Sequence, residues 1–198
     1  MMERTAPTNM LYSVPNILTY IRILAVPLLA ACFYLEGDQA NWLALAIFVL
    51  AAITDFFDGY LARAWDQQSS LGRMLDPIAD KLLVSVVLLM LVYSGAISGL
   101  NVWAAVIILC REILVSGLRE FLAELRVTVH VTQLAKLKTT GQMVALGFLL
   151  AGSAGDKLFV YTSQLGIVML WIAALLTIYT GYDYFRVGIN HVINSNRS

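Results

Sequence analysis

The sequence has few charged residues, and this scarcity argues against an ordinary soluble protein. Of its 198 residues only 13% are charged, whereas roughly 25% is usual for soluble domains. Hydrophobic residues make up 60%, and the mean hydropathy is +0.77. These values predict an integral membrane protein. Because the formal net charge is zero, composition gives no support for nucleic-acid binding.

Cysteine and histidine are also scarce, which narrows the possible chemistry. The two cysteines, Cys32 and Cys110, lie in apolar runs without metal-ligand spacing, so packing or lipid contact fits them better than a disulfide. The two histidines, His130 and His191, lack the His-x-Lys pattern of phospholipase-D-type synthases and are interpreted as interfacial. The first ten residues lack a signal-peptide core, so we expect the N-terminus to be retained.

Apolar segments organise the rest of the chain into an all-α, polytopic domain that covers residues 1–198. Six transmembrane helices are predicted, at residues 17–35, 42–61, 75–92, 102–126 (with a polar second half), 141–150 and 160–182. Residues 1–14 are expected to be flexible or interfacial, and residues 187–198 to form a tail. The β-branched stretch 127–131 predicts a non-helical connection, after which Thr139 or Thr140 would cap the next helix.

The distribution of positive charge predicts the orientation of these helices. With six spans, twelve of the thirteen Lys and Arg residues fall on the side of the N-terminus, and only Lys157 falls on the other. Cytoplasmic segments carry the excess of Lys and Arg, so both termini are expected in the cytoplasm.

Four aspartates, Asp55, Asp58, Asp76 and Asp80, interrupt the second and third apolar segments. Each carboxylate at a bilayer centre costs about 2.5 to 3.5 kcal/mol, so four cost roughly 10 kcal/mol and require a functional explanation. On helices, Asp55 and Asp58 stand i, i+3 and Asp76 and Asp80 stand i, i+4, so each pair shares a face. Two such faces predict an all-oxygen cage for two divalent cations, Mg²⁺ or Mn²⁺, which commonly bridge phosphates.

Small and basic residues accompany the acids. Gly59 and Ala62 follow Asp55 at one-turn intervals and Gly72 precedes Asp76 by one turn, which opens a groove beside the carboxylates. Arg63 supplies a fork of donors suited to phosphate. A polar stripe of Asn16, Thr19 and Arg22 opens the first span. Interfacial snorkelling and a wall of a nucleotide site explain that stripe equally well.

These residues form the pattern D-x2-D-G-x2-A-R-x8-G-x3-D-x3-D, which matches all eight fixed positions of the CDP-alcohol phosphotransferase motif and resembles that family. The resemblance implies a CDP-diacylglycerol donor whose diphosphate lies on the metals. It also implies that Asp80 is the general base, a role that a carboxylate beside the cage is able to fill. The donor set implied is Asp55, Gly59, Ala62, Arg63, Gly72, Arg73, Asn16, Thr19 and Arg22.

A basic segment indicates the acceptor. Residues 111–126 and 135–140, with the opening 14–23, resemble the corresponding parts of bacterial members that use sn-glycerol 3-phosphate. The expected acceptor-binding residues are Arg111, Arg119, Lys136 and Lys138. About half of these basic residues are equally well explained as positive-inside residues.

The resemblance also implies a multi-pass protein of the bacterial inner membrane with its active site toward the cytoplasm, and small-residue helix faces suit a homodimer among membrane lipids. The motif is common to the whole family, so phosphatidylglycerol, inositol phosphate and serine remain alternative acceptors. A six-span cation-coupled transporter is a second hypothesis, against which stand the one-sided charge and the presence of Gly59 and Arg63. A membrane scaffold is a third, but it gives no reason for the acids.

Overall fold

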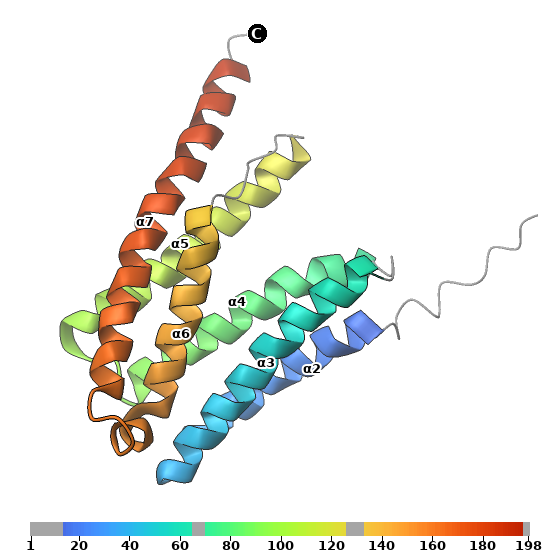
Figure 1. The fold of residues 1–198 in the computed structure, drawn as a ribbon. Helices are drawn as coiled ribbons and strands as arrows, with labels where there is room; N and C mark the ends of the chain where they lie inside the picture. Colours follow the sequence, from blue (N-terminus) through green and yellow to red (C-terminus); the bar gives the residue numbers. More distant parts are fainter. Residues whose placement is uncertain (1–13, 65–69, 126–132, 196–198) are drawn as a thin grey trace, which may run out of the picture. The chain divides into compact units, whose positions relative to one another are not determined.

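The computed structural model describes residues 14–64, 70–125 and 133–195, and across those ranges it contains α-helices, one short 3-10 helix and no strand. The α-helices are α2 (Val14–Cys32), α3 (Asp38–Ala64), α4 (Ser70–Tyr93), α5 (Val102–Glu124), α6 (Gln133–Asp156) and α7 (Thr162–Ser195), with η1 (Gly99–Asn101) before α5 (Figure 1). The chain divides into two compact units, residues 1–90 and 91–198, each of which is described by itself. The predicted all-helical class is therefore confirmed for the described residues.

The first unit is built on the pairing of α2 with α3 and on the first part of α4. Its apolar core includes Leu29 on α2, Ala44 and Phe48 on α3, and Leu83 on α4. Small side chains at Ala40, Ala44 and Ala51 recur on one face of α3, which allows a close approach of the neighbouring backbone. On the outer face of α2, by contrast, apolar side chains are exposed at Ile17, Ile21, Leu24 and Leu28.

The second unit packs α7 against both α5 and α6. Gly166 lies so close to α6 that an added Cβ would meet Leu149 Cγ at 2.9 Å, so only glycine allows this separation without a shift of Leu149. The start of α7 is fixed by Asp156, whose two carboxylate oxygens accept hydrogen bonds from the Ser163 amide (2.9 Å) and hydroxyl (2.5 Å). These hydrogen bonds, of which the one from the hydroxyl has the larger effect, hold the pKa of the Asp156 carboxyl below its usual value.

The helix boundaries depart from the sequence predictions in the fourth connection and at the C-terminal end. The capping prediction for Thr139 and Thr140 is wrong, because α6 already begins at Gln133 and both threonines lie inside it. The residues before them include Leu, Ala and Lys, which are strong helix formers and extend the helix toward its start. At the other end of α6, Gly152 departs from helical geometry with φ 47°, inside the predicted loop. Helix α7 continues to Ser195, beyond the predicted end of the sixth span.

Two segments meet the length and hydropathy expected of membrane spans. Among the described residues, Gly99–Ala123 and Thr162–Tyr182 are long and apolar enough to cross a membrane, with mean hydropathies of 1.7 and 1.8. Large apolar side chains remain exposed along these helices, as on Ile113, Leu114, Leu175 and Ile178. Residues 1–13 and 127–131, for which an interfacial segment and a non-helical connection were predicted, lie outside the described residues.

Candidate active site

The polar stripe of α2 is buried, which excludes the snorkelling interpretation of its sequence. Asn16, Thr19 and Arg22 stand at i, i+3 and i+6 on one helix face, and the Arg22 side chain is 0% exposed. A snorkelling arginine keeps its guanidinium in water. Arg22 therefore does not snorkel, and the stripe forms part of the interior of the first unit.

Arg22 lies among the motif aspartates. Its Nη1 forms ion pairs with Asp55 Oδ1 of α3 (2.8 Å) and Asp80 Oδ1 of α4 (2.9 Å). One turn earlier on α2, the Thr19 hydroxyl donates a hydrogen bond to Asp76 Oδ1 at 2.5 Å. Three helices thus meet at one polar cluster, in which Arg22 and Thr19 of α2 contact acids from both predicted pairs.

The remaining motif residues are placed by their helices. Asp58, Gly59, Ala62 and Arg63 lie in the last turns of α3, and Gly72 and Arg73 lie in the first turn of α4. Gly72 is buried, whereas the side-chain environments of the other five lie outside the description. Since α3 is helical there, Asp58 is one turn beyond Asp55 and on the same face.

The described contacts of this cluster hold more negative than positive charge. Asp55, Asp76 and Asp80 carry three carboxylates, and Arg22 brings one positive charge to them. The side chains of Asp55 and Asp80 are 43% and 50% exposed, so both carboxylates are partly accessible. Within the described residues no group of three Asp, Glu, His or Cys side chains is close enough to hold a metal ion, and Asp58 is outside that set. An accessible set of carboxylates nevertheless fits a hard divalent cation by its donor chemistry.

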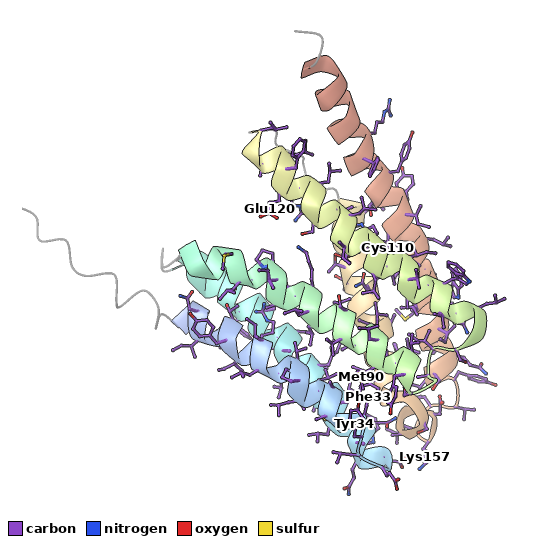
Figure 2. The ribbon with its side chains drawn as sticks, turned by 180° about the vertical axis from the view of Figure 1, so that it is seen from behind. Phe33, Tyr34, Met90, Cys110, Glu120 and Lys157 are labelled. Atoms are coloured by element: carbon purple, nitrogen blue, oxygen red, sulfur yellow. The ribbon has the colours of Figure 1, made fainter. Side chains whose placement is uncertain are left out.

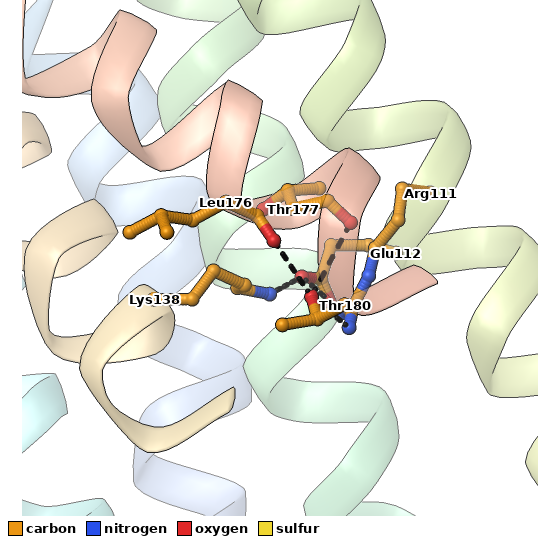
Figure 3. A network of polar contacts seen from close by, with 6 residues as sticks. All are labelled: Arg111, Glu112, Lys138, Leu176, Thr177 and Thr180. Atoms are coloured by element: carbon orange, nitrogen blue, oxygen red, sulfur yellow. Dashed lines mark hydrogen bonds and ion pairs between the residues drawn. The ribbon is translucent and has the colours of Figure 1, made fainter. Parts of the chain in front are cut away.

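A second polar cluster, within the second unit, joins α5, α6 and α7 (Figure 3). Glu112 Oε1 accepts a hydrogen bond from Arg111 Nη1 (3.2 Å) and also pairs with the ammonium of Lys138. Arg111 Nη2 donates to the Thr180 hydroxyl at 3.2 Å, and that hydroxyl donates to Leu176 O at 2.9 Å. The structure thus brings together Arg111 and Lys138, which lie on different helices and were predicted to bind the acceptor.

The other two predicted acceptor residues are Arg119 on α5 and Lys136 on α6. Arg119 is exposed, two turns after Arg111 on α5, and the side chain of Lys136 lies outside the described residues. Sequence reasoning missed Glu112 and Thr180. The only available signal was an acidic residue next to Arg111 in an otherwise apolar run, which by itself does not identify its partner on α6.

Known proteins with similar sequences identify the family of the chain. The sequence model of the family described as CDP-alcohol phosphatidyltransferase matches residues 12–179. The chain belongs to this family. A protein of Rickettsia bellii (strain RML369-C) named CDP-diacylglycerol--glycerol-3-phosphate 3-phosphatidyltransferase is 50% identical over 88% of this chain and 94% of its own length.

Two further relatives carry the same name. One from Cereibacter sphaeroides is 43% identical over 91% of this chain and 97% of its own length. One from Salmonella choleraesuis is 39% identical over 88% of this chain and 94% of its own length. The resemblance drawn from the aspartate motif is therefore confirmed at the level of the family.

Proposed function

We propose that the chain is a phosphatidylglycerolphosphate synthase, which transfers the phosphatidyl group of CDP-diacylglycerol to sn-glycerol 3-phosphate. The products are phosphatidylglycerol phosphate and CMP. The observation that carries the proposal is the name shared by relatives that are 39 to 50% identical over nearly their whole length. The polar cluster of the first unit supports it, because the family motif residues Asp55, Asp76 and Asp80 all take part.

On the donor side, Asp55, Asp58, Asp76 and Asp80 would hold two divalent cations, Mg²⁺ or Mn²⁺. When bound, the cations would neutralise the diphosphate of the donor and polarise its phosphorus–oxygen bonds. Arg22 and Thr19 orient the carboxylates through the contacts described above, and Gly59, Ala62, Arg63, Gly72, Arg73 and Asn16 complete the proposed donor set. The proposed reaction needs no covalent nucleophile from the protein.

Asp80 is the proposed general base. Its carboxylate would take the proton of the acceptor hydroxyl while that oxygen attacks the phosphate attached to diacylglycerol. The bond from this phosphorus to the oxygen of CMP then breaks, and CMP leaves with the bonding electrons. Arg22 pairs with one oxygen of Asp80, whose side chain is half exposed.

On the acceptor side, we assign Arg111, Arg119, Lys136 and Lys138 to the phosphate of glycerol 3-phosphate. This group carries nearly two negative charges and three acceptor oxygens, which Arg and Lys bind through charge-assisted hydrogen bonds. The pairing of Arg111 and Lys138 through Glu112 supports the assignment, since it gathers positive charge from two helices.

The proposed location is the bacterial inner membrane, with six spans and both termini in the cytoplasm. The exposed apolar stripe of α2 supports contact with lipid, because lipid chains cover such a surface without cost.

We also propose a homodimer, in which small-residue helix faces pack closely. Its mass in nanodiscs would test this: a single-chain mass would contradict the dimer and leave the activity untouched.

The decisive test is release of CMP by purified protein from CDP-diacylglycerol and Mg²⁺, with glycerol 3-phosphate, serine, inositol phosphate and phosphatidylglycerol as separate acceptors. We expect release with glycerol 3-phosphate alone. Preference for another acceptor would refute the proposed substrate but not the reaction class. Absence of CMP release with every acceptor would refute both.

The orientation can be tested by cysteine labelling in a background with Cys32 and Cys110 replaced. Val160 lies just before α7 and is 75% exposed, so Val160→Cys should react with an impermeant thiol reagent added outside spheroplasts. Glu120→Cys, on exposed α5 surface near Arg119, should react only after permeabilisation. Gly155 is unsuitable as the outer position, because its added Cβ would lie 2.7 Å from Thr162 Cγ2. The reverse labelling would place the basic segments outside.

Replacement of Arg119 by Ala should weaken use of the acceptor more than use of the donor. Loss of one charge-assisted contact costs about 1.5 to 3 kcal/mol, or roughly ten-fold to a hundred-fold in KM for glycerol 3-phosphate. The KM for CDP-diacylglycerol should change little. Lys157→Ala, which removes an exposed cation after α6, is the matched control and should leave both constants unchanged. An unchanged acceptor KM in Arg119→Ala would remove Arg119 from the site.

A further inference from the structure

Glu112 occupies a central position in the second polar cluster that the proposed function does not use. Among the residues that the structure describes, it is the only acid in the contacts of that cluster. A single oxygen, Oε1, contacts both Arg111 on its own helix and Lys138 on α6 (Figure 3). The two cations would otherwise repel each other at close range. Glu112 therefore allows both charges to stand side by side.

The burial of Lys138 makes this contact more important. The Lys138 side chain is only 3% exposed, and Glu112 is the one acid that pairs with it in the described part of the chain. A buried ammonium without an opposite charge is strongly disfavoured and loses its proton or moves toward water. The carboxylate of Glu112 thus favours the charged form of Lys138 and fixes its ammonium between α5 and α6.

The side chain of Arg111 is also held by a residue of α7. Thr180 accepts a hydrogen bond from Nη2, and the next residue, Gly181, leaves room for the side chain: an added Cβ there would stand 3.3 Å from Arg111 Cγ. Arg111 Nε is buried, and no protein group in the described ranges accepts a hydrogen bond from it. Its direction is therefore set by Glu112 and Thr180 together.

The cluster retains capacity for an anion. In the described contacts, Arg111 and Lys138 contribute two positive charges against the one negative charge of Glu112. The ammonium has three donors, of which Glu112 takes one in the described contacts, and the guanidinium has five. An anion with several oxygens is the ligand that such a set recognises.

We propose that Glu112 is a positioning residue for the acceptor: it holds Arg111 and Lys138 together as a paired receptor for a phosphate monoester. This inference rests on the proposed function, which supplies glycerol 3-phosphate as that monoester. Glu112 does not touch the phosphate in this arrangement and acts through its two cationic partners. The geometry gives selectivity for acceptors that carry a phosphate over neutral alcohols and amino acids.

The first test compares Glu112→Gln with Glu120→Gln, a matched control at an exposed position farther along α5 (Figure 2). We expect Glu112→Gln to raise the KM for glycerol 3-phosphate about ten-fold or more, which corresponds to the loss of one charged contact. Its KM for CDP-diacylglycerol and its melting temperature should shift far less. The inhibition constant of inorganic phosphate, used as a competitive inhibitor, should rise by a similar factor. The control variant should match the wild type in all four measurements.

A double-mutant cycle then asks whether Glu112 acts through Lys138. Lys138→Met keeps the length of the side chain and removes its charge, and by itself should raise the acceptor KM. If Glu112 works by holding Lys138, adding Glu112→Gln to Lys138→Met should raise the KM by clearly less than the product of the two single effects. Independent effects that multiply would contradict the pairing as the mode of action.

The outcomes separate this inference from the proposed function. If the wild type fails to use glycerol 3-phosphate, the proposed function fails. If the wild type uses it but Glu112→Gln leaves the acceptor KM unchanged, or lowers kcat with both KM values unchanged, Glu112 is only a structural residue and the inference fails. Should Glu112→Gln not be recovered folded, Glu112→Asp replaces it: the carboxylate withdraws by one methylene, and the same selective rise in acceptor KM is required.

Discussion

Replacement of Asp55 by Asn should abolish CMP release, and removal of divalent cations with EDTA should have the same effect on the wild type. Asp55 belongs to the accessible carboxylates of the first unit and is proposed to bind cations together with Asp58, Asp76 and Asp80. An amide has one neutral oxygen in place of an anionic pair, so it binds a hard cation far less well. We expect at least a hundred-fold loss of turnover, measured as CMP formed under saturating substrates, since losing such charge stabilisation costs about 2.7 to 4 kcal/mol.

The loss should occur without unfolding. Asp55 is 43% exposed, and Arg22 keeps its ion pair with Asp80 when Asp55 is neutralised, so no buried charge is left alone by the change. The melting temperature in detergent should therefore stay close to that of the wild type. Asp38→Asn, at the other end of α3, serves as the matched control and should retain activity. Full turnover in EDTA would refute the metal proposal.

The helices themselves were predictable because hydropathy is a local property of the chain. Long apolar runs specify where helices lie, and the structure has α2 to α7 at the six predicted positions, displaced mainly at their ends. The ends depend on helix propensity and capping, which compete closely. For this reason α6 extends back to Gln133, past the two threonines proposed as caps.

The site was predictable only in part, because spacing gives the face of a helix but not its neighbour. The i, i+4 spacing places Asp76 and Asp80 on one face of α4, where Thr19 and Arg22 contact them. Spacing gave no means to see that Arg22, 33 residues before Asp55, would be fully buried against it. The pairing of Glu112 with Lys138 also joins residues far apart in sequence. Such contacts depend on how helices pack, which a single sequence does not specify.

Replacement of Asp80 by Asn should reduce kcat much more than it weakens binding of the donor. Asparagine has nearly the same shape, and its side-chain oxygen can still accept the hydrogen bond from Arg22 that Asp80 accepts at 2.9 Å. What the amide cannot do is take a proton from the acceptor hydroxyl. Loss of a general base lowers turnover by about 10²- to 10⁴-fold.

The comparison that isolates this role is between kcat and donor affinity in the same variant. An interaction that exists only in the transition state lowers kcat and leaves ground-state binding intact. Calorimetry with CDP-diacylglycerol and Mg²⁺ should accordingly give a Kd for Asp80→Asn within a few-fold of the wild type. If binding of the donor is lost together with turnover, Asp80 acts only as a metal ligand, and the proton of the acceptor must leave through another group.

Because Arg22 joins Asp80 to Asp55, Arg22→Lys should show an intermediate fall in kcat. A lysine keeps the charge but loses the planar fork that fixes the carboxylate.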